Sequence, residues 1–417
     1  MRAKQSVSFW RRHRWLKFIL IGVAVAGVVV LAAIIIVHQQ AARFQAKLQP
    51  FYNTAGLSLT GQPGEVVRQE PLGVEMPGGK GVRVLYRTQR VDGSPTFSSG
   101  MVFLPDKPAG DTATPVVAWA HGTLGMGSQC APSRTADPLK ASPWISSMLQ
   151  KGWIVTATDY AGFGTPGVQG YLVGGDEAHD VLNSVRAARQ LDARADSRFV
   201  VWGHSQGGNS ALFTAEQAGT YTPELRLLGT VASAPAAELV ALLNEQYGTA
   251  VDWVIGPLVV TSWPAANPAL DRSTVLTSLG GSTYQAIADQ CIVPATFEGL
   301  IRTALKQQFF SRNPIDVPAW REMAEEQSAP ILASSQPLLV VESQTDKVVL
   351  PNTTALYITD ACKAKSNLTS LWLDNVAHQN IPFQSASQVI GWIGGRFAGI
   401  PPAQPCTQKL PVTPISP

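Results

Sequence analysis

Charged residues, histidine and cysteine are all scarce in this sequence. Only 15% of the 417 residues are charged whereas 45% are hydrophobic, which excludes a largely disordered chain and suffices for one large α/β domain with an insertion. Six basic residues and no acid lie in the first 17 positions, so the net charge of +3 leaves −3 for the remainder. That balance gives no support for nucleic-acid binding. The four cysteines form no C-x-x-C motif or Cys/His cluster, so the sequence predicts no metal site.

Residues 18–37 form an uncharged, mostly apolar run of twenty residues directly after the basic segment 1–17. Twenty helical residues match the thickness of a bilayer core, and the apolar part of a cleaved signal peptide is usually shorter. We therefore predict a single-pass signal anchor in the cell membrane, with residues 1–17 in the cytoplasm and the chain beyond a linker at 38–60 outside it. The alternative is a long signal peptide cleaved near residue 42, which releases a secreted or periplasmic protein.

Beyond residue 60, strand-like and helix-like patterns alternate, which predicts an α/β fold with a mostly parallel sheet and helices on both faces. The expected strands are at 82–88, 100–104, 116–120, 153–158, 199–202, 226–232, 337–341 and 370–373, and the expected helices at 176–191, 209–217, 353–364 and 385–397. The alternation stops at 236–330, where short helix-like pieces contain no convincing strand. We interpret this stretch as an inserted helical cap, or lid, and residues 61–235 and 331–417 as the α/β core.

The most informative motif is Gly203-His204-Ser205-Gln206-Gly207, which fits G-x-S-x-G. It follows an apolar strand-like run and leads into a helix-like stretch, so the serine lies in a sharp turn between a strand and a helix. Glycines on both sides permit a strained backbone that lifts the Ser205 hydroxyl clear of the sheet. The pattern is typical of a nucleophile elbow, with Ser205 as the nucleophile and Gly203 and Gly207 as the elbow glycines.

A serine hydroxyl becomes an effective nucleophile only beside a base that a carboxylate orients. In folds with this elbow the chain order is serine, acid, histidine, and His378 is the one histidine of six that follows Ser205. We therefore predict His378 as the base and Asp346, in the loop after a predicted strand, as the acid. Glu342 and Asp374 are competing candidates for the acid. The alternative role for Asp346 is to cap the turn that follows it.

Attack on a carbonyl group also needs donors for the negative charge that develops on its oxygen. We expect one donor to be the backbone N–H of Gln206, directly after the nucleophile. The other is expected to be the N–H of Thr123, in the His121-Gly122-Thr123 turn that follows a predicted strand. The alternative is that His121 and Gly122 only pack beneath the elbow.

Cys130, Cys291, Cys362 and Cys406 are an even number of cysteines in a domain that we expect to be exported, which favours two disulfides. Three pairings are open. We favour Cys130 with Cys291 and Cys362 with Cys406, because the second bond would fasten the proline-rich C-terminal tail to the body of the protein. Four buried free thiols are the alternative.

These features together resemble the α/β-hydrolase superfamily and, within it, the secretory lipase family of fungal lipase A type enzymes and their bacterial relatives. The resemblance spans about residues 50–410. It is carried by the turn 121–123, the glycine-rich turn 159–164, the elbow, the Asp346 loop, His378, the inserted cap and the cysteine positions. It implies an α/β-hydrolase fold, a helical lid over an acyl pocket and two disulfides. The apolar N-terminal run departs from freely secreted members of the family.

The resemblance and the predicted Ser205, His378 and Asp346 triad imply a carboxylic-ester hydrolase, a lipase or esterase that forms an acyl-enzyme with an ester or lipid substrate. This chemistry requires no metal or organic cofactor. One alternative is an acyltransferase, which uses the same triad to pass the acyl group to an acceptor other than water. The other is a catalytically inactive, anchored binding protein on the same fold, since a fold does not fix a function.

Overall fold

The computed structural model describes residues 14–109, 113–402, 406–407 and 409–416. The chain divides into two units, one that ends at Pro50 and one that begins at Phe51. In its described part the first unit is helical, and its helix α2 (Arg14–Tyr52) extends two residues past the boundary. The predicted linker at 38–60 is therefore helical as far as Tyr52. The physical reason is that residues 39–49 are mostly good helix formers, with no proline before Pro50.

Helix α2 includes the apolar run that predicted a signal anchor. The run is only part of this helix, which has 39 residues and is rich in Gln, Arg and Lys in its later turns. Among the residues that the structure describes, no helix combines the length and the apolar character needed to cross a membrane. The transmembrane anchor predicted at 18–37 is therefore not supported.

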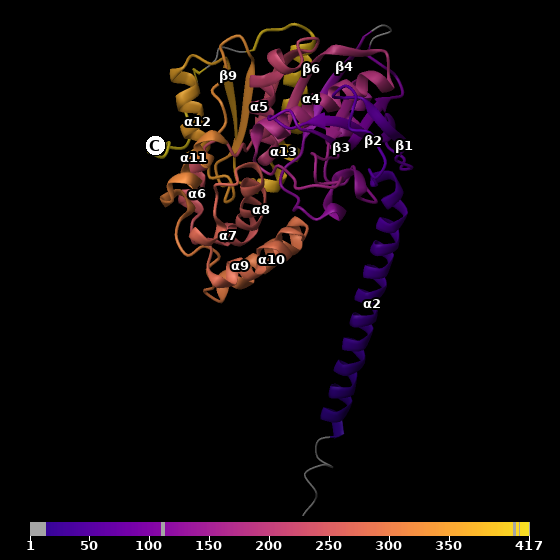
Figure 1. Ribbon diagram of the computed structural model, residues 1–417, viewed down its shortest axis with the longest axis vertical. Helices are drawn as coiled ribbons and strands as arrows, with labels where there is room; N and C mark the ends of the chain where they lie inside the picture. Colours follow the sequence, from indigo (N-terminus) through magenta and orange to yellow (C-terminus); the bar gives the residue numbers. More distant parts are fainter. Residues whose placement is uncertain (1–13, 110–112, 403–405, 408, 417) are drawn as a thin grey trace, which may run out of the picture. The chain divides into compact units, whose positions relative to one another are not determined.

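The second unit is built on one nine-stranded sheet in the described residues (Figure 1), with the order β1-β2-β3-β5-β4-β6-β7-β8-β9. Strands β4 to β9 pair in parallel, while β1, β2 and β3 form an antiparallel edge that joins β5. The strands are β1 (Val66–Pro71), β2 (Gly79–Gln89), β3 (Pro95–Pro105), β4 (Thr114–Ala120), β5 (Ile154–Thr158), β6 (Ala195–His204), β7 (Arg226–Ser233), β8 (Leu338–Ser343) and β9 (Leu368–Leu373).

Helices cover both faces of this sheet, and the side chains of β4 show the alternation that makes two cores. Val117 and Trp119 point to one face, whereas Val116 and Ala118 point to the other. The first face carries α3 (Trp144–Gln150) and α13 (Ile381–Phe397), and the second carries α4 (Gly174–Leu191), α5 (Gln206–Tyr221) and α12 (Pro351–Lys363). Each large apolar side chain that is fully buried here contributes about 1.5–3 kcal/mol to folding.

The inserted stretch after β7 folds as a group of helices that lie together in Figure 1. They are α6 (Leu239–Gln246), α7 (Ala250–Val254), α8 (Gly256–Ala266), α9 (Ser278–Ala288), α10 (Ile292–Ala304) and α11 (Pro318–Glu326). Aromatic pairs fill their interior, with ring centroids 5.2 Å apart for Trp253 and Phe309 and 6.3 Å apart for Trp263 and Trp320. This interior is continuous with the sheet face that carries α3 and α13.

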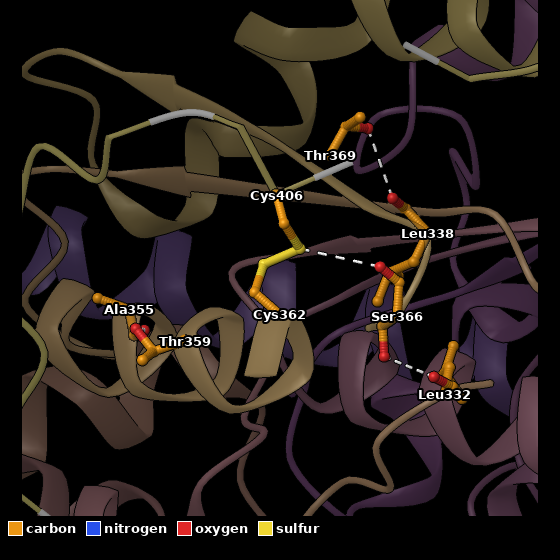
Figure 2. Close-up of a disulfide and its surroundings, with 8 residues drawn as sticks. All are labelled: Leu332, Leu338, Ala355, Thr359, Cys362, Ser366, Thr369 and Cys406. Carbon is orange, nitrogen blue, oxygen red and sulfur yellow. Dashed lines mark hydrogen bonds between the residues drawn. A yellow bond between two sulfur atoms is a disulfide. The ribbon is translucent and has the colours of Figure 1, made fainter. Parts of the chain in front are cut away.

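Two disulfides join Cys130 to Cys291 and Cys362 to Cys406, so the favoured pairing is confirmed. Figure 2 shows the second bond, where the sulfur of Cys406 lies 3.8 Å from the carbonyl oxygen of Ser366. The backbone N–H of Cys406 donates to the carbonyl oxygen of Leu368 at 3.0 Å, in the first residue of β9. The tail is therefore fastened at Cys406 both to α12 and to the edge of the sheet.

Candidate active site

Ser205 occupies a sharp turn between β6 and α5. Its φ of 58° and ψ of −117° lie in a region that residues with a side chain rarely adopt, at a cost of about 1–3 kcal/mol. A Cβ atom on Gly203 would lie 1.8 Å from the carbonyl oxygen of Gly207, and a Cβ atom on Gly207 would lie 2.0 Å from that of Ala120. Any other residue at either position would force the turn apart. The local backbone therefore has the geometry of a nucleophile elbow.

His378 and Asp346 contact each other, although they follow different strands. Asp346 lies in the loop after β8, and His378 begins a short 3-10 turn after β9. The His378 Nδ1 atom is 2.6 Å from Asp346 Oδ2, and Asp346 Oδ1 accepts the backbone N–H of Val348 at 2.7 Å. The Asp346 side chain is wholly buried. With the Nδ1 proton directed at the carboxylate, Nε2 is the nitrogen that remains to act as a base.

The other two candidates for the acid have different partners. Glu342 is fully buried at the end of β8, where it accepts one backbone N–H and the hydroxyl of Thr354 at 2.6 Å. Burial, and then the charge of the nearby Asp346, raise the pKa of the Glu342 carboxyl group well above its usual range. Asp374 is exposed and accepts a hydrogen bond from a glutamine amide. Of the three candidates, Asp346 is the one bonded to His378.

The loop that carries His378 is bonded to the elbow. His204 precedes Ser205, and its Nε2–H donates to the carbonyl oxygen of His378 at 3.0 Å. The two imidazole rings have centroids 4.7 Å apart. Burial, and then the proximity of His378, lower the pKa of His204 well below its usual value, so this imidazole is neutral. The backbone of His378 is therefore held next to the turn at Ser205 by the neutral imidazole of His204.

The turn after β4 also lies against the elbow. A Cβ atom on Gly122 would be 3.3 Å from the Cβ of Ser205 and 3.1 Å from the carbonyl oxygen of His204, so this backbone passes beside the serine. The hydroxyl of the next residue, Thr123, bonds the phenol of Tyr171 at 2.9 Å. Gln206 is the first residue of α5, where backbone N–H groups have no partner within the helix. Both expected oxyanion donors thus belong to segments at the elbow.

Two residues beside these donors were not found from the sequence. Glu177 is buried in the first turn of α4, and its carboxyl group accepts the side-chain amide of Gln206 at 2.5 Å. The sequence offers one signal, an acid near the start of a predicted helix, but such a carboxylate usually interacts with the helix dipole. Tyr171 lies in a loop without a recognisable motif. Its contact with Thr123 exists only once the chain has folded.

The parallel sheet and its elbow define an α/β-hydrolase. The family model of the secretory lipases matches residues 139–405, which is more than half of the chain. The chain therefore belongs to the secretory lipase family, and lipase-type ester hydrolysis is the activity that this membership supports.

Relatives of known name are similar over most of the chain. A Mycobacterium tuberculosis protein named probable inactive lipase MT1628 is 24% identical over 381 residues, which are 84% of this chain and 82% of that protein. The secreted triacylglycerol lipase LIP4 of Malassezia globosa is 24% identical over 345 residues, 76% of this chain and 72% of the lipase. Names within this group thus include both a secreted lipase and a protein described as inactive.

Solved structures show the same fold at low sequence identity. Candida antarctica lipase A superposes with a TM-score of 0.68 at 16% identity and covers 87% of this chain and 89% of its own. The rice cell wall degrading esterase LipA from Xanthomonas oryzae superposes with a TM-score of 0.66 at 15% identity, and the match covers 81% of this chain and 98% of the esterase chain. The predicted α/β-hydrolase architecture is therefore confirmed.

Proposed function

We propose that this protein is a carboxylic-ester hydrolase that uses Ser205, His378 and Asp346 as a catalytic triad. One observation carries the proposal. Ser205 lies in an elbow with positive φ, and the preceding residue, His204, is hydrogen-bonded to the backbone of His378, whose imidazole is paired with Asp346. Membership of the secretory lipase family supports the reaction class. This combination is what acyl transfer through a serine requires.

In the proposed mechanism, Ser205 Oγ attacks the ester carbonyl carbon while His378 Nε2 takes the hydroxyl proton. The backbone N–H groups of Gln206 and Thr123 donate to the resulting oxyanion. His378 then gives its proton to the leaving alkoxide, and the acyl group stays on Ser205 as an ester. Water then attacks that ester while His378 takes its proton, and His378 returns this proton to Ser205 Oγ as the carboxylic acid leaves. Asp346 keeps the imidazole in the required tautomer throughout.

We further propose that residues 236–330 act as a lid over the acyl pocket and that the substrate is a lipid ester. The outer face of α10 supports this role. Its large apolar side chains are more than half exposed, as is that of Leu305 just beyond it: Val293, Phe297, Leu300, Ile301 and Leu305. A contiguous apolar surface of this kind is unusual on a soluble protein and is typical of a surface that meets lipid or another protein.

We infer that the enzyme acts outside the cytoplasm. Its two disulfides suit an oxidising compartment, since cytoplasmic thiols are normally kept reduced. The secretory lipase family and the secreted relative from Malassezia globosa support the same location.

Two other functions compete with hydrolysis. An inactive protein on this fold is favoured by one observation, the relative that is named inactive. Against it, the strained turn at Ser205 is a cost that a protein without a nucleophile has no reason to keep. An acyltransferase differs only in the acceptor of the acyl group, so product analysis is needed to recognise it.

The first test compares the wild-type protein with Ser205→Ala and His378→Ala on a short p-nitrophenyl ester. Each variant should lose about 10⁴-fold or more in kcat, because nucleophile and base act as one unit. A fluorophosphonate probe should label wild-type protein at Ser205 and leave Ser205→Ala unlabelled. A wild-type protein that is folded yet neither hydrolyses the ester nor reacts with the probe would favour the inactive alternative.

A further inference from the structure

The carboxyl group of Glu177 is enclosed next to the elbow. The residue is 1% exposed. Its Oε1 accepts two hydrogen bonds, from the side-chain amide of Gln206 at 2.5 Å and from the backbone N–H of Leu172 at 3.2 Å. Its Oε2 is buried and has no hydrogen-bond partner in the described part of the chain. One oxygen therefore acts as a double acceptor and the other makes no bond.

Burial favours the neutral form of this carboxyl group. Burial raises the pKa of Glu177 well above its usual range, against the two hydrogen bonds that lower it. An ionised carboxylate with an unpaired oxygen would be costly in this position. A neutral acid with its proton on Oε2 leaves Oε1 as a carbonyl-type oxygen, which is the acceptor that the two donors need.

Each hydrogen-bond partner of Glu177 Oε1 is connected to one of the expected oxyanion donors. Gln206 carries one of those donors on its own backbone. Leu172 follows Tyr171, whose phenol bonds the hydroxyl of Thr123 at 2.9 Å, and Thr123 carries the other donor. Leu172 has a φ of 51°, an uncommon backbone conformation that local bonds must maintain. A single side chain thus connects the segments that present both donors.

We propose that Glu177 is a positioning residue for the oxyanion hole, fixing Gln206 directly and Thr123 through the turn at Tyr171 and Leu172. The inference rests on the proposed hydrolase function and adds a residue to it. A misplacement of about 1 Å is enough to cost a large part of the stabilisation that such donors give to a transition state. Glu177 makes no contact with the reacting atoms in this scheme.

The test exchanges the carboxyl group for groups that keep its volume. Glu177→Gln retains an Oε1 acceptor, whereas Glu177→Met removes it. Asp180→Asn is the matched control, because Asp180 is also buried on α4 but bonds the Thr88 hydroxyl and the Ala161 N–H instead. For each variant, kcat and KM are measured on p-nitrophenyl butyrate. The inhibition constant is measured with a boronic acid that forms an anionic adduct on Ser205, and Tm is measured by calorimetry.

We expect Glu177→Met to lower kcat about 10- to 100-fold with little change in KM, and to weaken boronic-acid inhibition by a similar factor. Glu177→Gln should stay within a few-fold of wild type in both kcat and the inhibition constant. Asp180→Asn should change Tm alone. Wild-type kcat in Glu177→Met, or equal losses in the Gln and Met variants, would overturn the inference.

A second route does not depend on Glu177→Met folding well. Gln206→Ala removes the amide that bonds Glu177 but keeps the backbone N–H, so it should lower kcat and boronic-acid affinity without raising KM. Glu177→Gln, which retains the acceptor, should add no further loss when it is combined with Gln206→Ala. Full kcat in Gln206→Ala contradicts the positioning role. Absence of ester hydrolysis in the wild-type protein would instead contradict the proposed function.

Discussion

At the proposed triad, hydrogen bonding distinguishes one carboxyl group from its neighbours. Glu342, Asp346 and Asp374 all lie at the ends of β8 and β9, yet only the Asp346 carboxylate is bonded to the Nδ1 of His378. In the proposed mechanism, a carboxylate in that position holds the tautomer whose Nε2 accepts a proton from Ser205. The buried Glu342 has other partners, because its two carboxyl oxygens accept the backbone N–H of Ser343 and the hydroxyl of Thr354.

Asp346→Asn should therefore lower kcat by a factor on the order of a thousand or more, because the amide favours the wrong imidazole tautomer. Asp374→Asn and Glu342→Gln serve as controls and should each change kcat by less than about fivefold. Hydrolysis of p-nitrophenyl butyrate measures all three, with circular dichroism to verify folding. A severe loss in Asp374→Asn and a mild one in Asp346→Asn would assign the acid to the other loop.

The residues that the sequence could identify are those with a motif or a fixed chain order. Ser205 stands in a recognisable elbow, and His378 is the sole histidine after it. Asp346 could be proposed from its place after a strand, but its bond to the imidazole depends on how two loops meet. Glu177 could not be found, because its function depends on a contact with Gln206 that exists only after α4 packs beside α5.

At the scale of elements, α10 combines a tightly packed face with an exposed apolar one. Gly299 faces α7, where an added Cβ would lie 3.0 Å from Val254 and 3.2 Å from Trp253. On the exposed face, Phe297 and Ile301 are 65% and 60% exposed. The small residue fixes the helix in the cap, and the large residues are left available to contact a lipid surface.

The double substitution Phe297→Asn and Ile301→Asn should lower the hydrolysis of emulsified triacylglycerol several-fold and leave kcat/KM on a dissolved butyrate ester unchanged. The side chains are exposed, so stability should change by no more than about 0.5 kcal/mol per site. Ile400→Asn is a matched control, since Ile400 is 59% exposed but lies outside the cap. An equal loss on both substrates, or none on the emulsion, would show that this face does not meet lipid.

Helices and strands with strong apolar patterns could be predicted from the sequence, whereas elements that lack such a pattern could not. The central strands are almost continuous apolar runs, so their positions in the sequence were evident. Strand β1 has the sequence Val-Val-Arg-Gln-Glu-Pro at an edge of the sheet, where pairing with β2 rather than burial maintains it. The helical residues beyond 38 were missed for the opposite reason, because their composition suits both a linker and a helix.

At the scale of the whole molecule, the parallel sheet brings together residues that are far apart in sequence. Thr123, Ser205, Asp346 and His378 follow β4, β6, β8 and β9, and parallel strands end at the same edge. Ligands in open α/β sheets bind at that edge. The alternation of strands and helices was enough to predict this arrangement. It was not enough to predict how the cap meets the core.

The structure shows one junction between cap and core in detail. The backbone N–H of Ile292 donates to the carbonyl oxygen of Leu124 at 2.9 Å, and that of Met126 donates to Ala288 at 2.8 Å. The bond between Cys130 and Cys291 closes the same junction. Since Leu124 directly follows Thr123, the proposed oxyanion turn and the start of α10 are held as one structure. The proposed lid would therefore keep this junction in place.

The two disulfides should consequently differ in function although both stabilise the fold. Removing either pair, as Cys130→Ala with Cys291→Ala or Cys362→Ala with Cys406→Ala, should cost about 2–5 kcal/mol of unfolding free energy. Only the first pair should also lower kcat on a dissolved ester, because it loosens the segment after Thr123, whereas the second fastens a tail away from that turn. Calorimetry measures the stability, and non-reducing mass mapping verifies the remaining bond. If the two variants have equal kcat, the junction between cap and core has no effect on catalysis and its disulfide only stabilises the fold.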